Sequence, residues 1–193
     1  MDINKKIFCD IDGVLNFHLA YFMNEAKKRG FKNVSLDNDS YTHILDATTK
    51  RPILRFHDLV DENYFRKVKP VISASNVLRR LVKEGCFITL ITKSTKYEEI
   101  RKEWLLRNGF PYPVIFLDNP TERAKLIQKQ KPFMVIDDYV LNLHELVKRK
   151  LYLDTIIVKY EQPYNKFYIN GHIYVCKNWK DIWELIKRKE SRQ

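Results

Sequence analysis

The sequence is poor in cysteine and contains no long uninterrupted hydrophobic segment. Its three cysteines, Cys9, Cys86 and Cys176, are an odd number without compact spacing, which argues against a disulfide framework and a zinc site. The five histidines show no metal-ligand spacing either. No apolar run is long enough to cross a bilayer, and the short polar segment before Lys6 does not resemble a signal peptide. We therefore expect a cytoplasmic protein that makes no membrane contact.

Composition limits the possible partners without choosing among them. The 193 residues are 45% hydrophobic, which suits one packed α/β domain with a small insertion and argues against disorder. The formal net charge of +11 suggests an anionic partner, such as a phosphorylated metabolite, nucleic acid or a membrane surface. Basic clusters at 148–150 and 187–189 fall at the ends of expected helices, where cations complement the helix dipole. That reading is favoured over a nucleic-acid surface.

A regular alternation of helices and strands begins after Pro70. Hydrophobic patterns predict helices at 73–84, 96–108, 122–129, 141–149 and 180–189, and strands at 86–92, 114–117, 133–136 and 155–158. The strands are continuously apolar, which is typical of a parallel sheet covered by helices on both faces. We expect an α/β, Rossmann-like core that also includes a first strand ending at Cys9. Near the end, Asn170-Gly171 predicts a β-hairpin over 166–175.

The segment 17–69 differs from the rest of the chain. Its pattern is helical from 17 to 29, and short helical pieces are expected at 40–48 and 61–68, with no convincing strand alternation. We predict a small helical cap over 17–69, inserted after the first strand. Residues 1–16 and 70–193 then form the core.

Paired acids follow two of the expected strands. Asp10 and Asp12 come after the first strand, and Asp137 and Asp138 come after the strand at 133–136. Ligands of parallel sheets collect at the carboxyl ends of the strands. Four converging carboxylates would repel one another without a cation, and a hard divalent ion such as Mg²⁺, which keeps waters and binds substrate phosphate as well, would relieve that repulsion. The alternative is that each pair only caps a helix or forms a turn.

These segments resemble a known superfamily. Asp10-Ile11-Asp12-Gly13-Val14-Leu15 is similar to the first motif of the haloacid dehalogenase (HAD) superfamily of phosphotransferases. Leu90-Ile91-Thr92 is similar to its second motif and Ile136-Asp137-Asp138 to its fourth. The resemblance implies that the chain is a phosphatase with a Rossmann-like HAD core.

A narrower resemblance comes from the C-terminal third. Gln162-Pro163-Tyr164-Asn165 followed by Asn178-Trp179 is similar to the C-terminal signature of the cytosolic 5'(3')-deoxyribonucleotidase family (5' nucleotidase, deoxy, type C). The segment from Tyr64-Phe65 to Pro70 is similar to the end of that family's cap. This resemblance implies hydrolysis of (deoxy)nucleoside monophosphates.

The two acids after the first strand are the expected catalytic pair. Asp10 would attack phosphorus to give an aspartyl-phosphate, and Asp12 would protonate the leaving oxygen and later deprotonate water. The resemblance implies both roles, and also that the Asp12 backbone carbonyl ligates Mg²⁺. The metal ligands expected are Asp10, Asp12, Asp137 and Asp138. Asp138 would bind the metal through water, or it would orient a lysine. The resemblance implies that this lysine belongs to the third motif of the superfamily and lies before the fourth strand.

Three residues are expected to bind the phosphate. The hydroxyl of Thr92 would hold a phosphate oxygen, although a β-branched strand residue without a role is the alternative. Lys93 stands where relatives often carry a small hydroxyl residue; it would add positive charge near the phosphate or point to solvent. Lys125 is the preferred third-motif cation over Lys129 and Lys131, although its spacing to Asp137 is longer than usual in the family.

Aromatic residues of the cap are the expected substrate contacts. The family places an aromatic against the nucleobase shortly after the first motif, so Phe17 is the first candidate, joined by Tyr64 and Phe65. Ordinary packing within the cap is the alternative for each.

The function expected from these residues and resemblances is that of a magnesium-dependent nucleotidase whose partner is a small phosphomonoester. Two alternatives stay open: a HAD phosphatase acting on nucleic-acid ends or another small phosphomonoester, and a non-catalytic nucleotide-binding protein.

Overall fold

The centre of the molecule is a six-stranded parallel sheet in which β1 lies between β5 and β7. The computed structural model describes residues 5–36 and 43–191. The strand order is β6-β5-β1-β7-β8-β9, and every pairing in it is parallel. The strands are β1 (Lys6–Asp10), β5 (Phe87–Lys93), β6 (Val114–Leu117), β7 (Met134–Asp137), β8 (Ile156–Tyr160) and β9 (Tyr174–Cys176). The predicted α/β class is confirmed.

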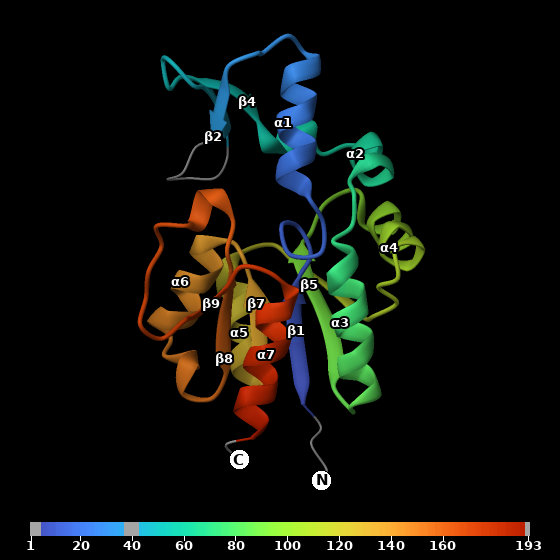
Figure 1. Ribbon diagram of the computed structural model, residues 1–193, viewed down its shortest axis with the longest axis vertical. Helices are drawn as coiled ribbons and strands as arrows, with labels where there is room; N and C mark the ends of the chain where they lie inside the picture. Colours follow the sequence, from blue (N-terminus) through green and yellow to red (C-terminus); the bar gives the residue numbers. More distant parts are fainter. Residues whose placement is uncertain (1–4, 37–42, 192–193) are drawn as a thin grey trace.

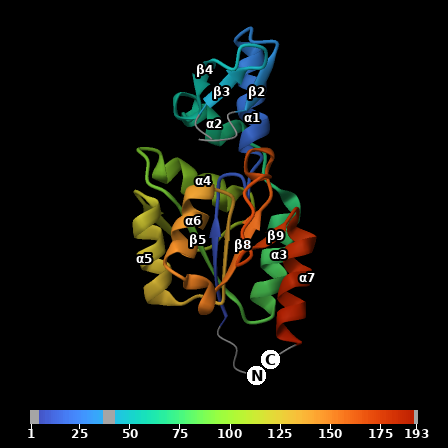
Figure 2. The ribbon, with the colours of Figure 1, turned by 90° about the vertical axis from the view of Figure 1, so that its left-hand side faces the viewer.

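Helices cover both faces of this sheet, as Figure 2 shows. Helices α3 (Ile72–Lys83) and α7 (Trp179–Glu190) lie on one face, and α5 (Pro120–Gln130) and α6 (Val140–Lys148) on the other. Alternate residues of β1 serve the two faces: Ile7 and Cys9 pack in the cluster with α3 and α7, and Phe8 packs in the cluster with α5 and α6. No helix of the described residues is long and apolar enough to cross a membrane.

The C-terminal hairpin predicted from Asn170-Gly171 is wrong. Residues 166–169 form no strand, and β9 pairs with β8 in parallel instead. The asparagine does make a tight turn, in which its side chain accepts a hydrogen bond from the backbone N–H of His172 at 2.9 Å. The preceding residues are held elsewhere, because the buried ammonium of Lys159 donates to the carbonyls of Asn165 and Tyr168 at 2.9 and 2.8 Å. Tertiary contacts override the local signal.

The described residues of the segment 17–69, called the cap below, lie over the carboxyl ends of the strands (Figures 1 and 2). It contains α1 (His18–Lys28), the short 3-10 helix η1 (Phe56–Leu59) and α2 (Glu62–Lys67). It also contains an antiparallel sheet of β2 (Val34–Leu36), β3 (His43–Asp46) and β4 (Pro52–Arg55).

This small sheet corrects two expectations about the cap. No strand was predicted there, and the helical piece expected at 40–48 is β3 over residues 43–46; residues 40–42 lie outside the described residues. The strands are three or four residues long, too short to show alternation. The turn that joins β3 to β4 is built by Asp46, whose side chain accepts from the backbone N–H groups of Thr48 and Thr49 at 2.9 and 2.7 Å.

The chain passes between cap and core at two adjacent segments. The Phe17 backbone N–H donates to the Lys69 carbonyl at 2.9 Å, and the Val71 N–H donates to the Leu15 carbonyl at 2.8 Å. Trp104 of α4 (Glu98–Arg107) donates its ring N–H to the Val68 carbonyl at 3.1 Å. These bonds tie the two crossing segments to each other and to α4.

Candidate active site

Three carboxylates meet at the carboxyl ends of β1 and β7. Asp10 is the last residue of β1 and Asp137 the last of the neighbouring β7, with Cys9 paired to Ile136. One oxygen from each of Asp10, Asp137 and Asp138 lies within 4.8 Å of the others, and all three residues are buried. The strand alternation points Asp10 the same way as Phe8, toward α5 and α6.

The cation of this cluster is Arg123, from the first turn of α5. Its Nη1 lies 2.8 Å from Asp10 Oδ1 and also forms an ion pair and hydrogen bond with Asp137 Oδ2. The N-terminus of α5 is capped, because the Asn119 side chain accepts a hydrogen bond from the Glu122 N–H at 3.0 Å, and Pro120 occupies the first turn. Arg123 is 5% exposed, on the face that α5 turns to the sheet.

Lys125, the lysine favoured from the sequence for this place, is exposed on the same helix. Two positions along a helix correspond to about 200° of rotation, so Lys125 and Arg123 leave opposite sides. Lys129 is also exposed, and Lys131 pairs with Asp154 at 3.0 Å. The third motif of the superfamily suggested a lysine, whereas the buried cation is the arginine that shares a stripe of α5 with Ala124 and Ile127.

The electrostatics of the cluster favour an added cation. Burial, Asp137 and Asp12 raise the pKa of Asp10 to about 7 against the opposing effect of Arg123. Burial, with Asp10 and Asp137 nearby, raises the pKa of Asp138 well above its ordinary value. A buried donor set made only of carboxylate oxygens fits a hard divalent cation such as Mg²⁺. Asp137 is further oriented by the Tyr139 N–H at 2.8 Å and the Asn142 amide at 3.0 Å.

Asp12 lies in a separate network that faces the cap. Arg101 Nη2 is 3.0 Å from Asp12 Oδ2, while the Tyr64 hydroxyl and the Asn16 amide donate to Asp12 Oδ1 at 2.8 and 2.9 Å. Burial alone would raise the pKa of Asp12, but Arg101, His18 and the two hydrogen bonds outweigh it and lower that pKa. The pKa values of Asp10 and Asp12 are therefore shifted in opposite directions, although the residues are two positions apart.

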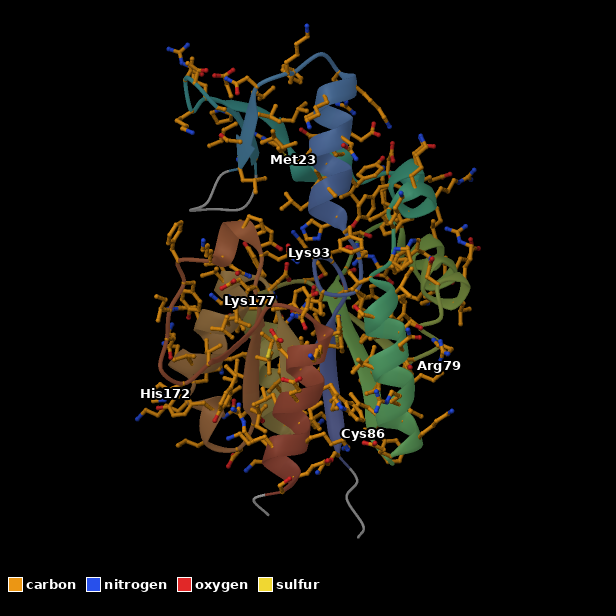
Figure 3. The ribbon with its side chains drawn as sticks, viewed as in Figure 1. Met23, Arg79, Cys86, Lys93, His172 and Lys177 are labelled. Carbon is orange, nitrogen blue, oxygen red and sulfur yellow. The ribbon has the colours of Figure 1, made fainter. Side chains whose placement is uncertain are left out.

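The Thr92 hydroxyl joins the same network. Thr92 is 1% exposed near the end of β5, and its Oγ1 accepts a hydrogen bond from Arg101 Nη1. Arg101 was not identified from the sequence. Lys93, which follows and ends β5, is exposed near the junction of cap and core (Figure 3).

The C-terminal signature holds the loop after β1 against Asp138. Gln162 Nε2 donates to the Gly13 carbonyl at 2.6 Å, the Tyr164 hydroxyl bonds to Asp138 Oδ2, and the Asn165 amide donates to the Asp138 carbonyl at 2.7 Å. Gly13 has φ +82°, and a Cβ there would clash with the Asp138 carboxylate and come within 2.7 Å of the Tyr164 hydroxyl. A side chain at position 13 would disrupt these hydrogen bonds from Gln162, Tyr164 and Asn165, which are called the clamp below.

The aromatic residues expected to contact substrate lie in different environments. Tyr64 and Phe65 of α2 are 1% and 2% exposed, and the Tyr64 hydroxyl contacts Asp12. Phe17 is 51% exposed and lines a hollow of about 300 Å³ together with Tyr21. The other residues lining that hollow are Ala20, Asn24, Glu25, Lys28, Lys67 and Lys69.

Comparison with known proteins gives a match over almost the whole chain. The family model described as 5' nucleotidase, deoxy (pyrimidine), cytosolic type C protein matches residues 4–192. A curated Bacillus cereus protein named "Putative nucleotidase" is 26% identical over 138 residues, which cover 69% of each chain.

Solved structures share the fold at low sequence identity. D,D-heptose 1,7-bisphosphate phosphatase from Burkholderia thailandensis has a TM-score of 0.57 and 10% identity, covering 95% of this chain and 98% of its own. The B. bronchiseptica enzyme of the same name, solved with magnesium and phosphate, has a TM-score of 0.54 and 11% identity over 96% and 99%. A HAD-superfamily hydrolase from Ehrlichia chaffeensis has a TM-score of 0.53 and 15% identity over 97% and 98%.

Proposed function

The chain belongs to the cytosolic type C 5' nucleotidase family of HAD-superfamily phosphatases, and from that premise we propose that it hydrolyses (deoxy)nucleoside monophosphates in a magnesium-dependent reaction. The observation that carries this proposal is the buried cluster of Asp10, Asp137 and Asp138 with Arg123 at the ends of β1 and β7. The cluster combines a nucleophile, a fixed cation and a donor set for a metal.

Asp10 is the proposed nucleophile. Its Oδ attacks phosphorus as the bond from phosphorus to the ester oxygen breaks, which gives an aspartyl-phosphate and releases the nucleoside. Arg123, 2.8 Å from Asp10 Oδ1, offsets negative charge on the reacting groups. Asp10, Asp137 and Asp138, with the Asp12 carbonyl that the family resemblance implies, would hold Mg²⁺, which supplies further neutralisation of the phosphoryl charge.

Asp12 is the proposed general acid and base. It would give its proton to the leaving oxygen, then accept a proton from the water that hydrolyses the aspartyl-phosphate. The bonds from Tyr64 and Asn16 to its Oδ1 leave Oδ2, with Arg101, as the oxygen for this transfer. The Thr92 hydroxyl, buried beside Arg101, would hold a phosphoryl oxygen.

The cap over residues 17–69 would close on the substrate and exclude water from the site, with residues 1–16 and 70–193 as the core. Phe17, largely exposed, is the proposed aromatic contact for the nucleoside. Three unpaired buried cysteines support the proposed cytoplasmic location.

A phosphate-release panel tests the proposal. Nucleoside 5'- and 3'-monophosphates, sugar phosphates and end-phosphorylated oligonucleotides are compared with magnesium and with chelator. We expect release from nucleoside monophosphates that requires the metal and disappears in Asp10→Asn, while Asp154→Asn at the exposed surface keeps wild-type activity. No release from any monophosphate, or unchanged turnover in Asp10→Asn, would contradict the proposal.

A second candidate is a phosphatase of nucleic-acid ends. The net charge of +11 and the lysines 28, 67 and 69 beside the exposed ring of Phe17 favour it. It predicts faster release from an oligonucleotide end than from a mononucleotide, with a rate that falls steeply as salt increases. Equal or faster release from the mononucleotide removes it.

A further inference from the structure

Arg101 is a buried cation beside the proposed reaction centre that the mechanism above leaves without a role of its own. It comes from α4 and is 2% exposed. Its two Nη atoms contact Asp12 Oδ2 and Thr92 Oγ1. Its Nε is buried and finds no hydrogen-bond partner among the described residues. The guanidinium is therefore only partly satisfied.

Helix α4 presents this arginine on its apolar face. Arg101, Trp104 and Leu105 are buried together at helical spacing, and Trp104 is bonded to the cap–core junction through Val68. The ring of Phe65, from α2 of the cap, lies 5.1 Å from the guanidinium carbon of Arg101. The side chain is thus held by both the core and the cap.

Comparison with Arg123 indicates what Arg101 is there to bind. Arg123 is shared by two buried carboxylates, Asp10 and Asp137, which together compensate its burial. Arg101 has one carboxylate, Asp12, whose side chain is 32% exposed, and its other hydrogen bond goes to a neutral hydroxyl. Burying a guanidinium with so little compensation is costly unless an anion completes the site.

We propose that Arg101 binds the phosphoryl group of the substrate together with Thr92, so that the site recognises phosphate with two arginines of separate helices. This inference rests on the proposed function of the same site. A planar guanidinium offers two parallel donors to a phosphoryl group, which suits it to phosphate more than an ammonium group. Phosphate bound by Arg101 would replace the contact of its Nη2 with Asp12 Oδ2.

The test measures phosphate binding directly. Inorganic phosphate is titrated calorimetrically into the magnesium-loaded protein, and its inhibition constant is measured alongside KM and kcat for a nucleoside monophosphate. Losing charge-assisted hydrogen bonds predicts that Arg101→Ala weakens phosphate binding by about 10- to 100-fold and raises KM similarly. Arg107→Ala is the matched control, because Arg107 is exposed on the same helix and its side chain donates a hydrogen bond to the backbone carbonyl of Phe65, away from Asp12 and Thr92.

The alternative is that Arg101 only positions Asp12. That role predicts a lower kcat with unchanged phosphate binding, and this result would overturn the inference. If Arg101→Ala does not fold, as judged by circular dichroism and Tm, Arg101→Lys replaces it. The lysine variant should bind phosphate several-fold more weakly, since an ammonium lacks the paired donors. Unchanged binding in that variant also overturns the inference.

Calorimetry separates failure of this inference from failure of the proposed function. A wild-type protein that binds phosphate but hydrolyses no nucleotide would refute the proposed function, and the Arg101 variants would still decide the role of Arg101. A wild-type protein that hydrolyses nucleotides, with variants that bind phosphate normally, would refute the role of Arg101 alone.

Discussion

The two halves of the site are built differently, although Asp10 and Asp12 are two residues apart. The Asp10 half consists of strand ends and Arg123 of the core, and it concentrates three buried carboxylates. The Asp12 half uses Arg101 together with Tyr64 of the cap. The first half raises the pKa of Asp10 and Asp138, and the second lowers the pKa of Asp12, which must therefore take up a proton when substrate binds if it is to act as the general acid. The proposed metal-binding half therefore depends on the sheet, and the half proposed for proton transfer depends on where the cap sits.

Removing the cation of the Asp10 half should have the largest effect. Arg123→Ala should lower kcat/KM by about a thousandfold, because Asp10 and Asp137 lose their fixed positive charge. Lys125→Ala, two positions along α5 and exposed, should leave turnover unchanged. Steady-state kinetics with saturating magnesium decides this, and the opposite ranking would restore Lys125 as the functional cation.

The stability of the metal-free protein should fall as pH rises. The folded-state pKa of Asp10 is about 7, above its ordinary 3.8, so folding binds a proton between these values and loses that contribution as pH rises through about 7. The free energy of unfolding should drop by on the order of 1–4 kcal/mol between about pH 4 and about pH 8. Denaturant titrations in chelator measure it.

Two controls isolate the source of that drop. Asp10→Asn should reduce it, and Asp154→Asn should not, because Asp154 is exposed. Magnesium should raise the stability most at the higher pH, where the carboxylates are ionised. If the free energy of unfolding of the metal-free protein rises over this pH range, the raised pKa of Asp10 is contradicted.

Breaking the clamp on Asp138 should weaken metal binding while leaving the Asp12 half intact. Tyr164→Phe removes the hydroxyl that bonds to Asp138 Oδ2. Because a hydrogen bond behind a metal ligand is lost, the magnesium concentration that gives half-maximal activity should rise about 10- to 100-fold. Tyr168→Phe is the control in the same loop, because its hydroxyl has no hydrogen-bond partner among the described residues. Equal effects in both variants would contradict the role of the clamp.

The smallest effect is expected from one hydrogen bond of the Asp12 half, the one that Tyr64 donates. Tyr64→Phe deletes one of the hydrogen bonds to Asp12 Oδ1 and leaves the Asn16 amide in place. Losing one hydrogen bond of about 1 kcal/mol predicts a several-fold lower kcat with an unchanged magnesium requirement. Kinetics over a magnesium titration measures both. A change in the magnesium requirement instead would mean that the two halves are coupled.

The parallel core was predictable because its strands are continuous apolar runs that end in acids. The cap sheet was not, since its strands are too short to alternate and its turn depends on Asp46. The Asn170-Gly171 signal predicted a local turn well, but its strand pairing is decided by Lys159 and β8. Local sequence patterns predict turns, whereas contacts between distant parts of the chain determine which strands pair.

Both arginines of the site escaped prediction for one physical reason. Each lies on a helix, outside any strand-end motif, and its function depends on which way the helix faces. A signal did exist: Arg101 is in register with Trp104 and Leu105, and Arg123 with Ala124 and Ile127. An arginine on the apolar stripe of a helix is unusual, because its charge must be compensated inside the fold.

The hydrogen bonds that support the loop after β1 come from the far end of the chain. Gln162 bonds to the Gly13 carbonyl and Trp179 to the Val14 carbonyl, across 149 and 165 residues. During synthesis the proposed nucleophile therefore leaves the ribosome long before the segments that brace it. In a nascent chain that has not yet reached α7, the loop that follows the proposed nucleophile lacks these bonds, so competence for catalysis should arise only with the last stage of folding.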